Sequence, residues 1–150
     1  MISMQIDRSR QLTIFTISGD VAARDIIKAI IAAHEHAPTR YILWDARDAS
    51  VSHLSSAEVR AIVRSVTRHD LVPVGAKAAL VASSRMDFAI GRVCEAVAEE
   101  ETLPYTLSVF MDYDGALEWL DCPQPGSREP EAVKCTVRGN SLRVIGDLVD

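Results

Sequence analysis

Cysteine, positive charge and long apolar runs are all scarce in this chain of 150 residues. Its three cysteines are odd in number and widely spaced, which excludes a disulfide framework and a zinc-binding pattern. The net charge is −5, and no cluster of Lys and Arg is interleaved with aromatic residues, so we expect no nucleic-acid partner. No segment approaches the ~18 consecutive apolar residues of a membrane span, and the N-terminus has no signal-peptide pattern. We therefore expect no membrane span and a cytoplasmic location.

Motifs that carry familiar chemistry are also missing. The sequence has no G-x-S-x-G nucleophile turn, no P-loop and no H-E-x-x-H metal motif. The neighbouring histidines do not form a metal pair, because His34 falls on the apolar stripe of a predicted helix and His36 on another side. We therefore expect a non-enzymatic protein without a metal or a cofactor.

The composition is that of a folded domain, with 48% hydrophobic and 25% charged residues. Two β-rich runs predict an N-terminal hairpin, and Asp20 is a candidate cap for the helix that follows. Strand-like and helix-like patterns then alternate. The predicted strands are 4–7, 11–19, 41–46, 77–82 and 105–111, and the predicted helices are about 21–37, 53–69, 87–101 and 112–120. This order predicts an α/β fold, in which an N-terminal β-hairpin leads a mixed, mostly parallel sheet with about four helices.

The pattern changes after residue 120, where "DCPQPGSREPE" contains three prolines and a glycine. We predict an α/β domain over 1–121, a linker over 122–131 and a β-hairpin extension over 132–150 that turns at Gly139-Asn140. Two isolated strands are marginal alone, so the hairpin must lean on its own sheet, lean on a partner subunit or stay mobile. We single out its addition to the sheet edge of a second copy, as an oligomer contact.

Polar side chains stand where the predicted strands end. Asp45 and Arg47 follow one strand, and Ser83, Ser84 and Arg85 follow the next. Ligands of parallel sheets usually bind at this edge, where helices also begin. The partial positive charge of a helix N-terminus, together with the arginine, predicts a site for an anionic ligand.

Each of these residues also has a purely structural interpretation. Ser84 and Asp87 fit the [ST]-x-x-[DE] capping box, and we favour that interpretation over the anion site. Arg92, a further ligand-binding candidate, either points back to the edge or pairs with Glu95 or Glu99 on the surface. Asp45, Arg47 and Asp48 suggest an acid–base cluster, but we favour local pairing.

Four segments in order, "YILWDARDA", "LSSAEVRAIV", "KAALVASSRMDFAIGRVCEAVAE" and "LSVFMDYDGALEWL", resemble the STAS/SpoIIAA-like family of small bacterial domains. The resemblance covers about residues 2–121. It implies a non-enzymatic module that binds a regulatory protein partner and is switched by phosphorylation of a serine at the start of a helix. The matching positions here are Ser55 and Ser56. The acidic residue and the glycine that flank the family's serines are replaced by Leu54 and Ala57.

We therefore expect a STAS-like regulatory or protein-interaction domain that associates with itself, as a homodimer, through the C-terminal hairpin. An alternative is a small-molecule or lipid carrier that binds an anionic ligand at the strand-end edge. A hydrolase using Ser83 or Ser84 is a third interpretation, because α/β sheets support many chemistries.

Overall fold

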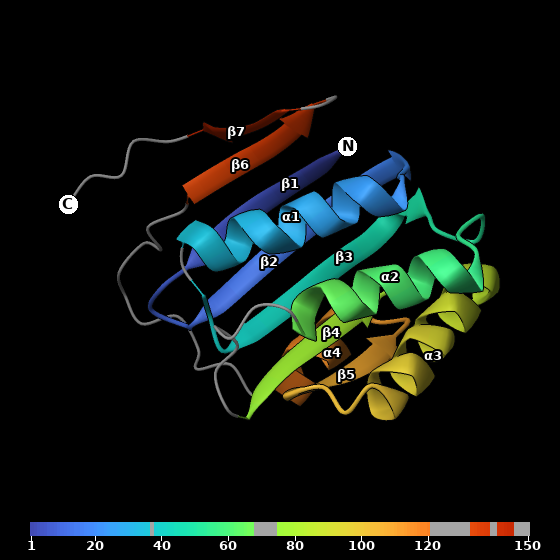
Figure 1. The fold of residues 1–150 in the computed structure, drawn as a ribbon. Coiled ribbons are helices and arrows are strands. Elements are labelled where there is room, and N and C mark those ends of the chain that lie inside the picture. Colours follow the sequence, from blue (N-terminus) through green and yellow to red (C-terminus); the bar gives the residue numbers. More distant parts are fainter. Residues whose placement is uncertain (37, 68–74, 121–132, 139–140, 146–150) are drawn as a thin grey trace.

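The chain folds as an α/β domain in which helices lie on both faces of one mixed sheet (Figure 1). The computed structural model describes residues 1–36, 38–67, 75–120, 133–138 and 141–145, the last two ranges by their backbone. The elements in chain order are β1 (Ile2–Asp7), β2 (Leu12–Asp20), α1 (Ala23–His36), β3 (Tyr41–Ser50), α2 (Ser56–Thr67), β4 (Ala76–Val81), α3 (Arg85–Glu100), β5 (Tyr105–Phe110), α4 (Tyr113–Leu120), β6 (Val133–Arg138) and β7 (Ser141–Ile145).

The strand order of the sheet is β5-β4-β3-β2-β1-β6-β7. β1 and β2 form the antiparallel N-terminal hairpin, and β2, β3, β4 and β5 run parallel to one another. Parallel neighbours need crossover connections, and the helices between the strands supply them. Over the described residues, the predicted fold class, a hairpin that leads a mixed, mostly parallel sheet with about four helices, is confirmed for β1 to β5, and β6 and β7 add antiparallel pairs.

Helix α1 begins later than the sequence predicts. Asp20 is the last residue of β2 and pairs with Ser50 of β3. The carbonyl of Ala22 accepts the hydrogen bonds of the first turn, from the N–H groups of Asp25 and Ile26. The predicted cap at Asp20 is therefore wrong, because the long pairing of β2 with β3 holds this residue in the sheet.

The two faces of the sheet are covered differently. Helices α1, α2 and α3 lie on one face and α4 on the other (Figure 1). Side chains alternate along β2, so that Leu12 belongs to the α4 face while Phe15 and Ile17 belong to the α1–α3 face. Phe15 stacks on Trp44 of β3 with ring centroids 4.0 Å apart. The buried core of the α4 face consists of Leu12, Leu43, Ala79, Val81, Ala116 and Leu120.

Gly91 allows α3 to pack directly on the sheet. A Cβ atom at this position would lie 2.8 Å from the Cβ of Val109 in β5 and 3.2 Å from Cδ2 of Leu80 in β4. The distance to Val109 is too short for a real Cβ atom and the distance to Leu80 is tight, so the helix packs at this depth because the residue is glycine. The contact joins "FAIGR" to "LSVFMDYDGALEWL", two of the segments that carry the STAS-like resemblance.

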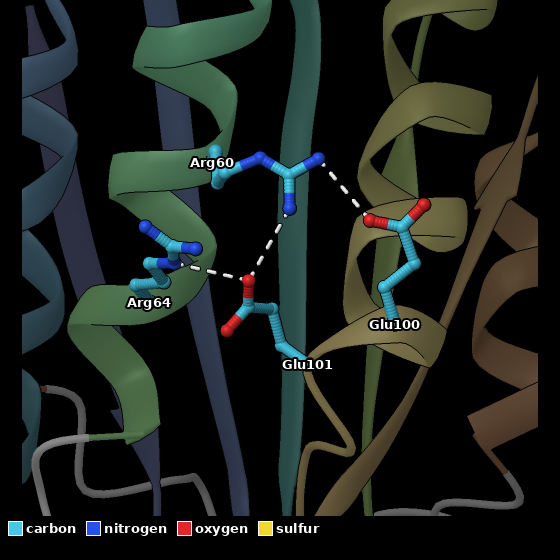
Figure 2. A network of polar contacts seen from close by, with 4 residues as sticks. All are labelled: Arg60, Arg64, Glu100 and Glu101. Atoms are coloured by element: carbon cyan, nitrogen blue, oxygen red, sulfur yellow. Dashed lines mark hydrogen bonds and ion pairs between the residues drawn. The ribbon is translucent and has the colours of Figure 1, made fainter.

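An ion-pair network joins α2 to the end of α3 (Figure 2). Nη2 of Arg60 lies 3.1 Å from Oε2 of Glu100, and its Nη1 lies 3.3 Å from Oε1 of Glu101. The same Oε1 atom is 3.0 Å from Nε of Arg64. These side chains stand at the surface, where water and salt screen the charges, so the network adds modest stability.

The C-terminal hairpin lies on the sheet of its own chain. β6 pairs antiparallel with β1, with Ile2 opposite Val137, and β7 pairs antiparallel with β6. Of the three arrangements that the sequence allows, the structure therefore shows the one within the chain, and β7 is the outermost strand (Figure 1). The predicted turn residues and the predicted linker lie outside the described residues.

Candidate functional site

The sequence-predicted residues at the strand ends come together only in part. β4 ends at Val81, so Ser83 and Ser84 stand in the predicted place between β4 and α3. Asp45 and Arg47 do not follow their strand as predicted, because β3 continues beside β2 to Ser50. The register shifts there, since Thr16 pairs with Asp45 and Ser18 with Asp48, as expected of a β-bulge.

Asp45 and Arg47 form a bidentate ion pair on the α4 side of the sheet. Nε and Nη2 of Arg47 each donate to one oxygen of Asp45, both at 2.8 Å. The guanidinium carbon also lies 4.5 Å from the ring centroid of Tyr113, which adds a cation–π contact. The favoured interpretation of local pairing for these two residues agrees with this geometry.

This pairing sets the ionisation of the three groups. The hydrogen bonds from Arg47 lower the pKa of Asp45, and Asp45 raises the pKa of Arg47 in return. Burial raises the pKa of the Tyr113 phenol. At neutral pH the pair is therefore fully charged and the phenol is neutral, which gives no group poised to exchange a proton in acid–base chemistry.

Ser83 ties the loop after β4 to β3. Its hydroxyl donates to the carbonyl oxygen of Arg47 at 2.8 Å. The N–H of the preceding Ala82 donates to the carbonyl oxygen of Phe110, at the end of β5, at 2.9 Å. The segment after β4 is thus tied by hydrogen bonds both to β3 and to the end of β5.

Ser84 caps α3, as the favoured interpretation predicts, but Asp87 accepts from the Ser84 hydroxyl instead of returning the capping-box bond to the Ser84 backbone N–H. The Ser84 oxygen accepts from the N–H of Asp87 at 3.1 Å and donates to its Oδ2 at 2.7 Å. Oδ1 of Asp87 accepts from the N–H of Val51, after β3, at 2.9 Å. This carboxylate is only 5% exposed and occupies the N-terminus of α3, so the helix end is already neutralised by the chain itself.

The two remaining arginines of the predicted anion site, Arg85 and Arg92, take no part in the hydrogen bonds of Ser84 and Asp87. Arg92 pairs with Glu95 at 2.7 Å on the surface of α3, as the structural alternative predicts. Arg85 is exposed, and the described residues offer it no hydrogen bond or ion pair. Sequence reasoning missed that Glu95 also accepts from the N–H of Val109 at 2.7 Å, which occupies a donor on the outer edge of β5.

Ser55 and Ser56 are both exposed at the start of α2. The predicted capping box is present, since Ser55 Oγ accepts from the N–H of Glu58 at 3.2 Å and Glu58 Oε2 accepts from the N–H of Ser55 at 2.8 Å. These bonds from Ser55 lower the pKa of Glu58. The Ser55 hydroxyl is therefore engaged in the cap, whereas Ser56 is the first residue of the helix.

Two exposed methionines at the same end of the sheet were missed in the sequence. Met86 is the second residue of α3, and Met111 follows the last residue of β5. Their exposed fractions are 66% and 49%. We call Arg47, Arg85, Met86 and Met111 the edge surface. The sequence signal for each was an apolar residue near a strand end, a pattern that fits a buried core position equally well.

Other ligand classes find less support in the described part of the chain. Within it, no group of three His, Cys, Asp or Glu residues stands close enough together to hold a metal ion. None of its helices combines the length and apolar character needed to cross a membrane. No protein-family model and no curated protein matches the chain, so the STAS-like resemblance stays a prediction.

Proposed function

We propose that the chain is a non-enzymatic regulatory domain of the STAS-like type, which binds a protein partner through the edge surface. The exposure of Met86, in the first turn of α3, and of Met111, just after β5, carries this proposal, because Ala82 and Phe110 join the segments that lead to them by a hydrogen bond. Methionine and arginine are enriched in protein interfaces, and the thioether side chain adapts readily to a partner.

The hydrogen bonds of the neighbouring loops strengthen the proposal. Ser83 binds β3 to the loop after β4, and Asp87 binds the start of α3 to Val51. A surface that is already ordered loses less conformational entropy when it binds. The exposed guanidinium group of Arg85 favours a partner whose contact surface carries a carboxylate beside an apolar centre.

Site-specific cross-linking in the cells of origin tests this proposal. A photoreactive amino acid placed at Met86 or Met111 is expected to capture the same protein, while the same group at exposed Lys28 on α1 is not. Met86→Glu and Met111→Glu should each weaken the captured complex at least about tenfold, since each buries an unpaired charge. Equal capture from all three positions, or none from the methionines, contradicts the proposal.

Phosphorylation at the start of α2 is the regulation that the resemblance implies. Ser56 is the acceptor that leaves the capping bonds of Ser55 and Glu58 intact. A phosphate there is stabilised by the positive end of the helix dipole. Mass spectrometry of protein from its own cells is expected to find the phosphate on Ser56, and a phosphate on Ser55 contradicts this choice.

Self-association through the C-terminal hairpin is a second proposal, favoured by the position of β7 as the outermost strand. An outer strand can pair with a second copy of itself. Light scattering is expected to give a dimer for the full chain and a monomer for a chain that ends at Asp121. If both are monomers, this proposal fails.

A further inference from the structure

An apolar cavity of about 110 Å³ lies between the sheet and the helices α1, α2 and α3. Its lining comes from strands β2 to β5, from these three helices and from the loop that leads into α2. It lies on the α1–α3 face, whereas Tyr113, which packs under Arg47, belongs to the α4 face. None of the residues that line the cavity belongs to the edge surface, so the two are distinct.

A short side chain in the middle of the sheet accounts for the space. Ala78 of β4 lies between Ile42 of β3 and Leu107 of β5 in the strand register. Neighbours in register point to the same face, so a methyl group stands between two larger side chains. The lining residues that α2 contributes include Val59 and Val63, which also have short side chains.

The size and lining fit a small apolar molecule better than water. A water molecule needs two to four polar partners, and this lining is almost entirely apolar. In another protein, an apolar cavity of ~150 Å³ stays dry and takes up benzene. A cavity of about 110 Å³ is somewhat smaller and accommodates one ring.

The lining also fixes the charge of the ligand. It contains no Asp, Glu, Lys or Arg, and its polar members are His34, Cys94 and Tyr105. Nδ1 of His34 donates to the carbonyl oxygen of Ile30 at 2.7 Å. Burial raises the pKa of Cys94 to about 11 and also raises the pKa of Tyr105, so both are uncharged at neutral pH. A charged ligand would lose its hydration here without gaining a counter-ion.

We propose that this cavity is a binding site for an uncharged, mostly apolar molecule with a single aromatic or alicyclic ring. The stacked rings of Phe15 and Trp44 stand in its wall and offer flat apolar contact. The site is independent of partner binding at the edge surface, and it differs from the predicted anionic-ligand site in both place and charge.

Toluene is the probe for the test, and the full chain is used throughout. Toluene is expected to shift the NMR signals of methyl groups in the lining, such as those of Val63, and to leave those of Leu12 and Leu120 on the α4 face unchanged. It should also raise the melting temperature, because a ligand that binds only the folded state stabilises it.

Cavity-filling variants locate the site. Ala78→Leu puts an isobutyl group into the space. The variant should keep its fold, and its affinity for toluene, measured by the methyl shifts, should fall at least about tenfold. Ala33→Leu fills the same space from α1 and should act in the same way. Ala61→Leu makes the identical change on the exposed face of α2 and should bind like the wild type.

Three results would overturn the proposal. They are no methyl shift in the wild type with toluene, equal shifts on both faces of the sheet, or unchanged binding in a folded Ala78→Leu or Ala33→Leu variant. Should one filled variant fail to fold, the wild-type titration and the other variant still decide. The edge-surface proposal is not affected by any of these outcomes, because cross-linking at Met86 and Met111 is measured without the probe.

Discussion

The two faces of the sheet differ in how completely their helices fill the space above the strands. On the α4 face a single helix of eight residues contributes two core side chains and covers four from the strands, and all six are fully inaccessible. On the α1–α3 face, three longer helices leave a cavity of about 110 Å³. At about 24 cal/mol per Å³, such a cavity amounts to roughly 2–3 kcal/mol of forgone stability.

The difference teaches where the fold tolerates imperfect packing. The α4 face is closed by contacts between α4 and the strands β3, β4 and β5, and Tyr113 at the start of α4 also packs on the Asp45–Arg47 pair. The cavity lies where three separate helices meet over the sheet. Functional sites often break a local packing rule, so the loosely filled face is the better place to expect a ligand.

The largest expected effect comes from the same substitution at two adjacent positions. Ala79→Leu overfills the α4 face, where Ala79 has no exposure, and should lower the free energy of unfolding by about 3 kcal/mol. Ala78→Leu fills the cavity and should leave that free energy unchanged or raise it by about 1 kcal/mol. Urea unfolding measures both, with Ala61→Leu as the control. If Ala78→Leu and Ala79→Leu lower the free energy of unfolding equally, the two faces do not differ in packing.

Two helical glycines give the next contrast. Gly91→Ala places a methyl group against Val109 and Leu80, and should cost about 2 kcal/mol despite the better helix propensity of alanine. In Gly115→Ala the added methyl group would lie 3.1 Å from Oδ2 of the exposed Asp112, a contact that a shift of a few tenths of an ångström relieves without breaking the 2.9 Å hydrogen bond that this oxygen accepts from the N–H of Gly115. The effect of this substitution should lie within about 0.5 kcal/mol. Thermal unfolding compares the two, and a tolerated Gly91→Ala would show that α3 can shift away from β5.

The ion pair on the α4 side predicts a pH dependence. The folded pKa of Asp45 lies below its usual value of 3.8, so its stabilisation is present above that pH and is lost as the pH falls through the folded value. Asp45→Asn should lower the free energy of unfolding by about 1 kcal/mol at pH 7, a modest figure because Arg47 is half exposed. Denaturant titrations should show that the difference in free energy of unfolding between the wild type and Asp45→Asn disappears as the pH falls below 3.8. The neighbouring Asp48→Asn is the control, and a difference independent of pH would argue against this origin.

The smallest expected effect comes from the ion-pair network between α2 and the end of α3. Glu101 holds both Arg60 and Arg64, so Glu101→Gln should cost about 0.5 kcal/mol at low salt. In about 1 M NaCl the difference should largely disappear, because the screening length falls to about 3 Å. Glu100→Gln removes a single, more exposed contact and should cost less. A loss that is unchanged by salt would place the role of Glu101 in packing instead.

Periodicity predicted most of the fold, because the alternation of strands and helices depends on local patterns of apolar residues. The boundaries that failed depend on neighbours: Asp20 stays in β2, and β3 runs to Ser50, because these two strands extend each other's pairing. The local capping pairs at Ser55 and Ser84 were also predictable, since their partners lie three residues away.

The candidate site was less accessible to sequence reasoning. The contacts of Asp87 with Val51 and of Glu95 with Val109 join residues far apart in the chain, and no local pattern announces them. Exposure of Met86 and Met111 was equally hidden, because an apolar residue beside a strand usually indicates core.

The sequence by itself determined the order and type of the elements, the hairpin that leads the sheet and the local caps, since each depends on residues within a few positions of one another. Only the tertiary structure decided that the C-terminal hairpin joins β1, that Asp45 and Arg47 neutralise each other, and that Ala78 leaves a cavity. The physical reason is that register and packing depend on which distant side chains meet and on the volume they leave between them.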